Sequence, residues 1–283
     1  MPRLTVKNNT IMKNILIYND ISGLGNCSMA ANLPIFTKLG HYCMPVVTAS
    51  YSSQTGFGNF LAQRNDSVEQ FSNRLLANRA PDAIYVGFCN DNAILSSITG
   101  IVSGICCKDV YLLVDPIMGD HGALYPVFDS TYLQQMKKLV AHAHCITPNL
   151  TEACLLSDVD YRELSRHKDE PTFLARCGEV FGDFLAKTGA QSAVITGIEC
   201  GKLLGNIVLD GTNRYYVTNE RVDITYSGTG DVFSSVVLGS LLNGHSLLAA
   251  TQVAANFVEK AARSTDCTDR RFGVEFAKVI DLL

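Results

Sequence analysis

Short apolar runs rich in β-branched residues alternate with longer helical patterns along most of this 283-residue chain. The runs that we expect to form strands are 14–18, 45–48, 83–86, 110–114, 145–147 and 193–196. Helical patterns follow them, up to Leu39 and then over 68–78, 92–105, 131–141 and 172–188. Repeated strand-then-helix units of this length predict an α/β fold of three layers, with a mostly parallel central sheet and helices on both faces.

The stretch 202–217 departs from this alternation. Residues 203–209 and 215–217 have the pattern of two strands, and Asp210-Gly211-Thr212-Asn213 between them is a hairpin signal. We therefore expect a small antiparallel hairpin at one edge of the sheet. The helices expected after it are 232–242, 247–262 and a last one that begins at Phe272.

Composition and charge narrow the class of partner. Hydrophobic residues make up 47% of the chain, which is enough for a substantial core. The net charge of −4 and the lack of Lys/Arg runs argue against a nucleic-acid or membrane surface, because those partners require a basic face. No apolar run reaches the ~18 residues of a membrane span. We expect a cytoplasmic protein that binds a small molecule and forms a single domain over 1–283, with a polar tail over 1–13.

Ten cysteines are scattered along the chain without a C-x-x-C pair. Most lie in apolar stretches, as Cys145 and Cys154 do, where free cysteine behaves as a small hydrophobe. We expect buried, unpaired thiols in a reducing compartment. His142 and His144 form an H-x-H pair, but no third ligand lies close in the sequence, so a place at a helix end is the better interpretation.

Polar residues gather where the predicted strands end. The carboxyl ends of parallel strands lie at one edge of a sheet, and ligands bind there in this class of fold. The residues expected at that edge are Asn19, Asp20, 48–55, Asn90, Asp91, Asp115, 147–152 and Thr196. A single cleft is predicted.

A Gly-Thr-Gly-Asp sequence, 228–231, begins the first helix after the hairpin. Its glycines permit a sharp turn and leave backbone N–H groups free at a helix start, where partial positive charge favours an anion. Asp231 adds a carboxylate to these donors, which is an arrangement suited to chemistry on an anion. An ordinary helix start capped by Thr229 or Asp231 explains the same residues, and the motif by itself does not decide between the two.

Two further motifs supply oxygen ligands at the same edge. Asp115-Pro-Ile-Met-Gly-Asp120 follows one strand, and Thr147-Pro-Asn-Leu-Thr-Glu152 follows another. Such oxygens suit Mg²⁺, which usually keeps several waters and is held through one or two carboxylates and substrate phosphates. The alternative is that Asp115 and Asp120 cap local turns and that Glu152 forms a capping box with Asn149, whose spacing fits.

Two common nucleotide motifs do not fit the chain. The Gly201-Lys202 pair is followed by Leu203 and not by Ser or Thr, so a P-loop is excluded. A dinucleotide fingerprint would begin at Gly23-x-Gly25, but Ser28 stands at the third glycine position. Any phosphate must therefore be held in another way.

Together, the Gly228 to Asp231, Asp115 to Asp120 and Thr147 to Glu152 motifs resemble the ribokinase-like superfamily, most closely its pyridoxal/pyridoxamine (vitamin B6) kinase branch. The resemblance extends from about Asn14 to Ser264. It implies a kinase that transfers the γ-phosphate of ATP to the hydroxymethyl group of a B6 vitamer, with Mg²⁺ as cofactor. A monovalent cation is left open as a second cofactor, and a homodimer is the assembly that the resemblance suggests.

The resemblance also implies roles for individual residues. Asp231 would be the base that takes the proton from the substrate hydroxyl, and the N–H groups of Gly228, Thr229 and Gly230 would hold the charge that develops. The residues implied around the ATP phosphates are Asp115, Thr147, Asn149 and Thr196, and those implied at Mg²⁺ are Asp120 and Glu152.

The substrate contacts implied by the resemblance are Asn19, Gln54, Thr55 and Phe88. Asn19 stands where a serine is common in the B6 kinases, next to the pyridine ring. Phe88 replaces a ring-stacking tyrosine, so that the flat apolar face is kept and the hydroxyl is lost. Residues 120–125 carry no cysteine that could capture an aldehyde. Pyridoxal, pyridoxamine and pyridoxine are therefore equal candidates.

Three alternatives share parts of this pattern. Hydroxymethylpyrimidine kinase has the fold and the Gly-Thr-Gly-Asp turn, but its first loop usually reads like Asp-Ser-x-Gly-Gly-Ala-Gly, whereas this chain has Asp20-Ile-Ser-Gly-Leu-Gly-Asn26. Sugar kinases need an N-terminal glycine pair and a β-lid of several strands, for which this chain is too short in that region. A non-catalytic B6-binding protein would place no constraint on residue 231, so the presence of Asp231 with both glycines of the motif favours catalysis.

Overall fold

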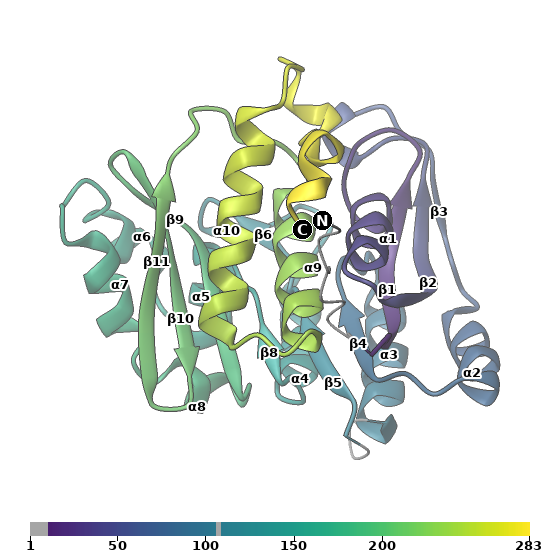
Figure 1. Ribbon diagram of the computed structural model, residues 1–283. Coiled ribbons are helices and arrows are strands. Elements are labelled where there is room, and N and C mark those ends of the chain that lie inside the picture. The colour runs from purple at the N-terminus through teal and green to yellow at the C-terminus, as the bar shows by residue number, and fades with distance from the viewer. Residues whose placement is uncertain (1–10, 106–108) are drawn as a thin grey trace, which may run out of the picture.

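The computed structural model describes residues 11–105 and 109–283, and its centre is a nine-stranded sheet (Figure 1). The strands are β1 (Asn14–Ser22), β2 (Tyr42–Tyr51), β3 (Ala62–Arg64), β4 (Ala83–Val86), β5 (Tyr111–Val114), β8 (Cys145–Ile146), β9 (Ser192–Cys200), β10 (Leu203–Asp210) and β11 (Asn213–Glu220). Their order across the sheet is β11-β10-β9-β8-β5-β4-β1-β2-β3. From β9 to β2 the neighbours are parallel, so the predicted parallel sheet is confirmed.

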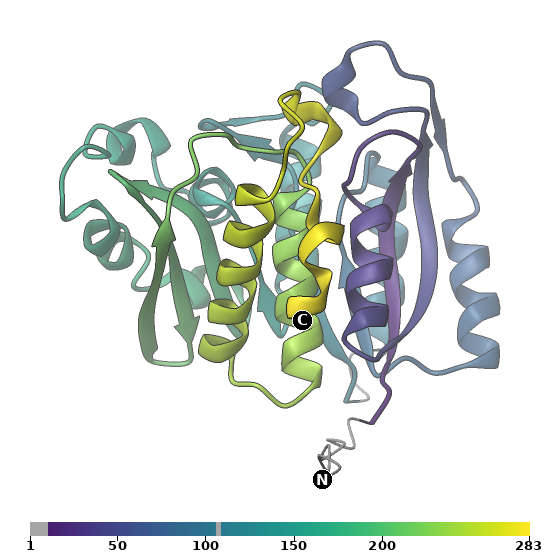
Figure 2. The same cartoon turned by 45° about the horizontal axis from the view of Figure 1, so that its top comes forward.

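Helices cover both faces of this sheet (Figure 2). One face carries α1 (Met29–Lys38), α9 (Thr229–Leu242), α10 (Leu247–Arg263) and the 3₁₀ segment η3 (Phe276–Leu282). The other carries α2 (Val68–Asn78), α3 (Asn92–Ile105), α4 (Ser130–Val140), α5 (Leu150–Ser157), α6 (Tyr161–Ser165), α7 (Phe173–Val180) and α8 (Phe184–Thr188). In β1, Ile15 and Ile17 enter one core while Leu16 and Tyr18 enter the other, because successive side chains of a strand point to opposite faces.

The two edges of the sheet are antiparallel. β10 and β11 form the predicted hairpin, and β10 also pairs with β9 in the antiparallel sense. β3 pairs with β2 at the opposite edge and was not predicted, since its three exposed residues carry no apolar pattern. A separate two-stranded hairpin, β6 (Gly119–Asp120) and β7 (Ala123–Leu124), lies in the loop after β5.

Two predicted helices are wrong. The segment 172–188 is not one helix, because a turn in which Gly182 N donates to Glu179 O at 3.0 Å separates α7 from α8. Glycine costs a helix interior about 1 kcal/mol relative to alanine, which favours a break there. The helix predicted from Phe272 is replaced by η2 (Arg270–Phe272) and η3, since Gly273 between them has a φ of 83°.

The cysteines that the structure describes are free thiols, at positions 27, 43, 89, 145, 154, 177, 200 and 267. Cys106 and Cys107 lie outside the described residues, as do the first ten residues of the predicted tail. Within the described ranges, no helix combines the length and the apolar character needed to cross a membrane.

Candidate active site

The turn before α9 is packed against the loop that follows β1. Gly228 is the N-cap residue of α9, with a φ of 78°. A Cβ at this position would overlap the backbone oxygen of Asn26, so only glycine fits here. Thr229 Oγ1 donates to Tyr226 O at 3.2 Å and closes the turn on its other side. The free N–H groups at the start of α9 are therefore held beside the first loop.

Asp231 lies in the first turn of α9 and is 6% exposed. Asn19 Nδ2 donates to its Oδ1 at 3.0 Å, and the backbone N–H of Ser28 also donates to this carboxylate. Burial raises the pKa of Asp231, while these two donors oppose the rise. Among the residues that the structure describes, no cation forms an ion pair with Asp231, and a buried carboxylate held in this way by fixed donors is a good candidate for a general base.

Asp115, the residue after β5, is a second buried acid close to the turn before α9. Ser234 Oγ donates to its Oδ2 at 3.0 Å, and the Tyr85 hydroxyl donates to the same oxygen at 3.4 Å. Burial and then the charge of Asp231 raise the pKa of Asp115 to about 7. Thr147 Oγ1 lies 2.9 Å from Ser234 Oγ, so Thr147, which follows β8, belongs to the same cluster of hydrogen-bonded side chains. The structure thus brings Asp115 and Thr147 together beside Asp231.

A third buried acid, Glu152, forms the capping box of α5 that was the alternative interpretation of its motif. Its Oε2 accepts from Asn149 N at 2.8 Å and its Oε1 from Met118 N at 3.1 Å. Burial and the charge of Asp115 raise the pKa of Glu152 well above its usual range. The capping role is therefore present, and a role at a metal stays a prediction.

Asp120 follows Gly119, whose backbone O accepts from Asn149 Nδ2 at 2.9 Å, and Thr196 forms a bridge with Asn149. The Asp120 side chain is 53% exposed and accepts from His121 N at 2.7 Å. Thr196 N donates to Pro148 O at 2.8 Å, which sets β9 beside Asn149. Among the described residues, no group of three or more His, Cys, Asp or Glu side chains is close enough to bind a metal. A pair of carboxylates fits Mg²⁺, because this ion fills its other positions with water and phosphate.

The predicted substrate residues differ in exposure. Asn19 is fully buried, whereas the ring of Phe88 is half-buried and lies 5.7 Å from Phe128 and 6.4 Å from Tyr51. Gln54 caps η1 (Thr55–Phe57), accepting from Gly56 N at 2.8 Å. Thr55 is exposed. Phe88, Gln54 and Thr55 are thus accessible to a ligand, and Asn19 is enclosed by protein.

The sequence did not predict that the C-terminal segment 270–274 would join the site. Gln54 Nε2 donates to Arg271 O at 3.0 Å, and the rings of Phe57 and Phe272 meet edge to face at 5.2 Å. The Arg271 guanidinium lies 4.8 Å from the centre of the Phe57 ring. We call 54–57 and 270–274 the outer clasp.

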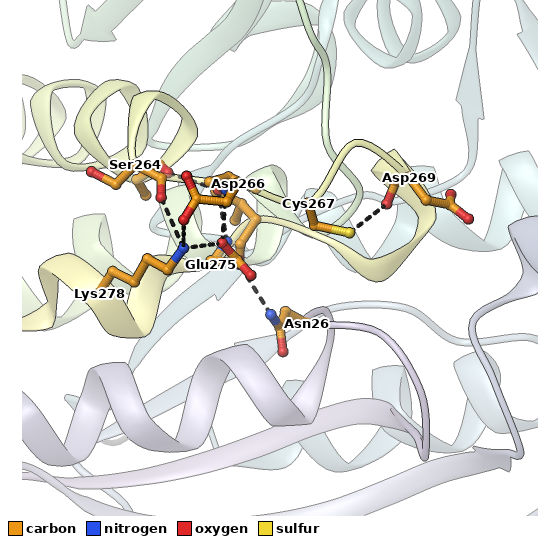
Figure 3. Close-up of polar contacts among 10 residues, drawn as sticks. Asn26, Ser264, Asp266, Cys267, Asp269, Glu275 and Lys278 are labelled. Atoms are coloured by element: carbon orange, nitrogen blue, oxygen red, sulfur yellow. Dashed lines mark hydrogen bonds and ion pairs between the residues drawn. The ribbon is translucent and has the colours of Figure 1, made fainter.

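Asn26 ties the outer clasp to the first loop. Asn26 N donates to Phe272 O at 2.9 Å and its Nδ2 donates to Val274 O at 3.3 Å. Figure 3 shows this side chain directed toward the segment that carries Glu275, where Lys278 bridges Asp266 and Glu275. Ser227 N in turn donates to Arg270 O at 3.2 Å, so the clasp also touches the turn before α9.

Several polar residues in the centre of the site were missed. They are Ser28, Asn32, Tyr85, Ser234 and Ser235, while Asp20 was predicted at the sheet edge without a role. Asn32 and the two serines stand inside otherwise apolar helices, and that contrast was a usable signal. Ser28 has a φ of 53°, which is unusual for a residue other than glycine and which the sequence does not reveal.

Comparison with known proteins confirms the predicted class, an ATP-dependent kinase for small molecules. The model of the phosphomethylpyrimidine kinase family matches residues 24–274, and the chain belongs to this family.

Kinases for two kinds of substrate resemble the chain. The hydroxymethylpyrimidine/phosphomethylpyrimidine kinase of Bacillus subtilis is 24% identical over 90% of this chain and 91% of its own. A Bacteroides thetaiotaomicron protein, provisionally assigned as a phosphomethylpyrimidine kinase and solved with pyridoxal, is 28% identical with a TM-score of 0.82 over 96% of each chain. Pyridoxal kinase from Lactobacillus plantarum is 27% identical, with a TM-score of 0.82 over 95% of each chain. The predicted ribokinase-like membership is confirmed.

Proposed function

We propose that this protein phosphorylates the hydroxymethyl group of a B6 vitamer, which is pyridoxal, pyridoxamine or pyridoxine, at the expense of ATP. The observation that carries this choice is the likeness over 96% of both chains to the Bacteroides thetaiotaomicron protein solved with pyridoxal. The half-buried ring of Phe88 supports it, because a flat apolar face suits an aromatic substrate ring.

In the proposed reaction, Asp231 accepts the proton of the substrate hydroxymethyl group while the oxygen attacks the γ-phosphorus. The bond from that phosphorus to the β,γ-bridging oxygen breaks, and ADP leaves. The N–H groups of Gly228, Thr229 and Gly230 stabilise the transferring group, since phosphoryl transfer depends on positioning and charge stabilisation. The raised pKa of Asp231 makes its carboxylate a better proton acceptor.

We further propose that Asp115, Thr147, Asn149 and Thr196 border the ATP phosphates. Asp120 and Glu152 would hold Mg²⁺ through bound water. When bound, Mg²⁺ supplies positive charge to the β- and γ-phosphates. The buried Glu152 supports this assignment, because a nearby cation would favour the ionised form of a carboxyl whose pKa burial has raised. Gln54, Thr55 and Phe88 would contact the vitamer.

Steady-state kinetics with Mg-ATP tests the proposal. We expect kcat/KM for at least one of pyridoxal, pyridoxamine and pyridoxine to exceed that for hydroxymethylpyrimidine by about tenfold or more. Asp231→Asn is the background control for each substrate. Turnover in K⁺ and in tetramethylammonium buffers decides whether a monovalent cation is a second cofactor.

Hydroxymethylpyrimidine kinase is the second candidate, favoured by the family match over 24–274 and by the Bacillus subtilis relative. A higher kcat/KM for the pyrimidine than for every vitamer would establish it and reject the B6 proposal. Vitamer binding without turnover of any substrate would instead identify a non-catalytic B6-binding protein.

We also propose a cytoplasmic homodimer, as the family resemblance suggests. The exposed edge strand β11 is one candidate contact surface, because an unpaired strand edge can pair with a second copy. Sedimentation equilibrium of the purified chain tests the assembly, and a monomer at micromolar concentration would reject it.

A further inference from the structure

The Asn19 side chain, at 0% exposure, uses its full hydrogen-bonding capacity within the protein. Its Nδ2 donates to Asp231 Oδ1 at 3.0 Å and to Asn32 Oδ1 at 2.8 Å. Its Oδ1 accepts from Asp20 N at 3.0 Å and from Phe88 N at 2.9 Å. A carboxamide with two donors and two acceptor sites filled in this way has no group left for a substrate.

The orientation of this carboxamide is fixed by its partners. Asp20 N and Phe88 N are obligatory donors, so the oxygen must face them and the nitrogen must face Asp231. A Cβ at Gly87 would lie 2.6 Å from Asn19 Nδ2, which shows how closely the backbone after β4 approaches. The register of β1 with β2 shifts between Asn19 and Ile21, and such irregularities re-aim side chains at sheet ends.

The network continues from Asn19 through Asn32. Asn32 Nδ2 donates to Ser235 Oγ at 2.8 Å, so α1 connects Asn19 to the helix that carries Asp231. Ser235 lies one turn of α9 beyond Asp231, and both are buried. Asn19 in β1 therefore holds the Asp231 carboxylate directly, and Asn32 in α1 holds the helix that carries Asp231.

We propose that Asn19 is a positioning residue that orients the Asp231 carboxylate and keeps it ionised, and that it does not itself contact the substrate. This inference rests on the proposed function, in which Asp231 is the base. It replaces the ring contact that the sequence predicted for Asn19. Through Phe88 N, the same carboxamide links the base to the backbone of the residue proposed to face the substrate ring.

Other charged or titratable groups also face Asp231, and the test must separate them from Asn19. Asp20 comes from β1, Asp115 from the end of β5, Tyr85 from β4 and Cys27 from the loop before α1. Asp20 and Asp115 place negative charge near Asp231. Asn19 and the Ser28 N–H are the donors that counter it.

The decisive variant is Asn19→Asp. It keeps the size and the acceptor oxygen of the side chain but puts a second oxygen where Nδ2 lies 3.0 Å from Asp231 Oδ1. We expect the acid limb of the pH profile of kcat/KM for pyridoxal to move to higher pH by about one unit or more. At neutral pH, kcat should fall by at least about tenfold, while KM for ATP should stay within about twofold.

Asn19→Ala serves if the aspartate variant does not fold. It should lower kcat and raise the acid limb by less, because the donor is lost without an added charge. The matched control is Asn206→Asp in β10, a buried asparagine whose Nδ2 donates to Val217 O at 3.4 Å and which lies outside the candidate site. It should lower the thermal midpoint without moving the pH profile.

A rise of about tenfold in KM for the vitamer, at unchanged kcat and with an unchanged acid limb, would overturn the inference and restore Asn19 as a substrate contact. Failure of the proposed function has a different signature. If Asp231→Asn keeps kcat within about tenfold of wild type, then the base assignment fails whatever Asn19 does.

Discussion

The two parts of the candidate site are built differently. The buried acid cluster of Asp20, Asp115 and Asp231 lies at 4 to 6% exposure, and its side chains accept hydrogen bonds from fixed donors. The outer clasp is held by ring edges, one guanidinium over a ring and a few backbone hydrogen bonds, and Thr55 and Phe272 are exposed.

The contrast suggests a division of labour. Buried charges with fixed partners cannot move without a large free-energy cost, so the chemistry is preorganised. Exposed contacts are worth little individually and can be exchanged without loss of the fold. We therefore expect changes in the buried acid cluster to alter kcat and stability, and changes in the clasp to alter KM and substrate choice.

The largest effect is expected for Asp231→Asn, which keeps the shape of the side chain and removes the base. Its kcat should fall by about 10² to 10⁴, because a positioned general base contributes that much. ATP affinity, measured by calorimetry, should be retained. A loss smaller than about tenfold would show that proton abstraction does not depend on this carboxylate.

Gly228→Ala should be the next most severe change, with Gly230→Ala as its matched control. At 228 a Cβ meets the Asn26 carbonyl at a φ of 78°, so the free energy of unfolding should fall by about 1 to 3 kcal/mol. At 230 the nearest atom to a Cβ is Asp115 Oδ2 at 3.9 Å, and the position is helical.

For Gly230→Ala the unfolding free energy should therefore change little or rise by up to about 1 kcal/mol. Urea unfolding of the two variants measures the difference. Equal stability of both would mean that the turn and the first loop are not in firm contact.

The pH dependence of stability tests the buried acids. Burial, and to a smaller extent the charge of Asp231, raises the pKa of Asp20 to about 7. An unfolded aspartate has a pKa of ~4, so the folded state binds an extra proton between about pH 4 and pH 7. The free energy of unfolding therefore falls as pH rises through that window. Asp20→Asn should remove about one proton from the difference in bound protons between the folded and unfolded states, which sets the slope of unfolding free energy against pH.

Urea midpoints at several pH values measure the slope, with Asp66→Asn as a control for the loss of an exposed carboxylate. An unchanged slope in Asp20→Asn would place the titrating proton elsewhere in the buried acid cluster.

The smallest effect is expected in the outer clasp. Arg271→Ala removes the cation over the Phe57 ring, a contact worth about 0.5 to 1 kcal/mol at an exposed site. KM for the vitamer should therefore rise by about twofold to fivefold while kcat is kept. Arg74→Ala, on the exposed side of α2, is the control. A fall in kcat of about tenfold would show that the outer clasp takes part in the chemical step and not only in substrate binding.

Local signals predicted much of the fold. The parallel strands have apolar patterns that each segment carries by itself, and the Gly-Thr-Gly-Asp turn is a contiguous motif. The interior partners of Asp231 were harder to predict, because Asn32 and Ser235 become meaningful only when α1 and α9 are packed side by side. The clasp was missed for the same reason, and no sequence pattern relates Gln54 to Arg271, 217 residues away.

Asn19 shows where matching to a family is insufficient. The sequence predicted a strand over 14–18 with Asn19 directly after it, whereas β1 extends to Ser22 and Asn19 lies within the strand. The direction of its carboxamide depends on the register shift within β1 and on the approach of Gly87, which are properties of the folded backbone.

The bond between Asn26 and Val274 joins residues 248 positions apart. On a translating ribosome that emits about 5 to 20 residues per second, the first loop emerges tens of seconds before the segment that it binds. The nascent chain can form its early strand-helix units in that interval, but segment 270–274 of the outer clasp has not yet been synthesised. The mouth of the site is therefore completed only after the strands of the sheet and the helices α1 to α10 have been synthesised.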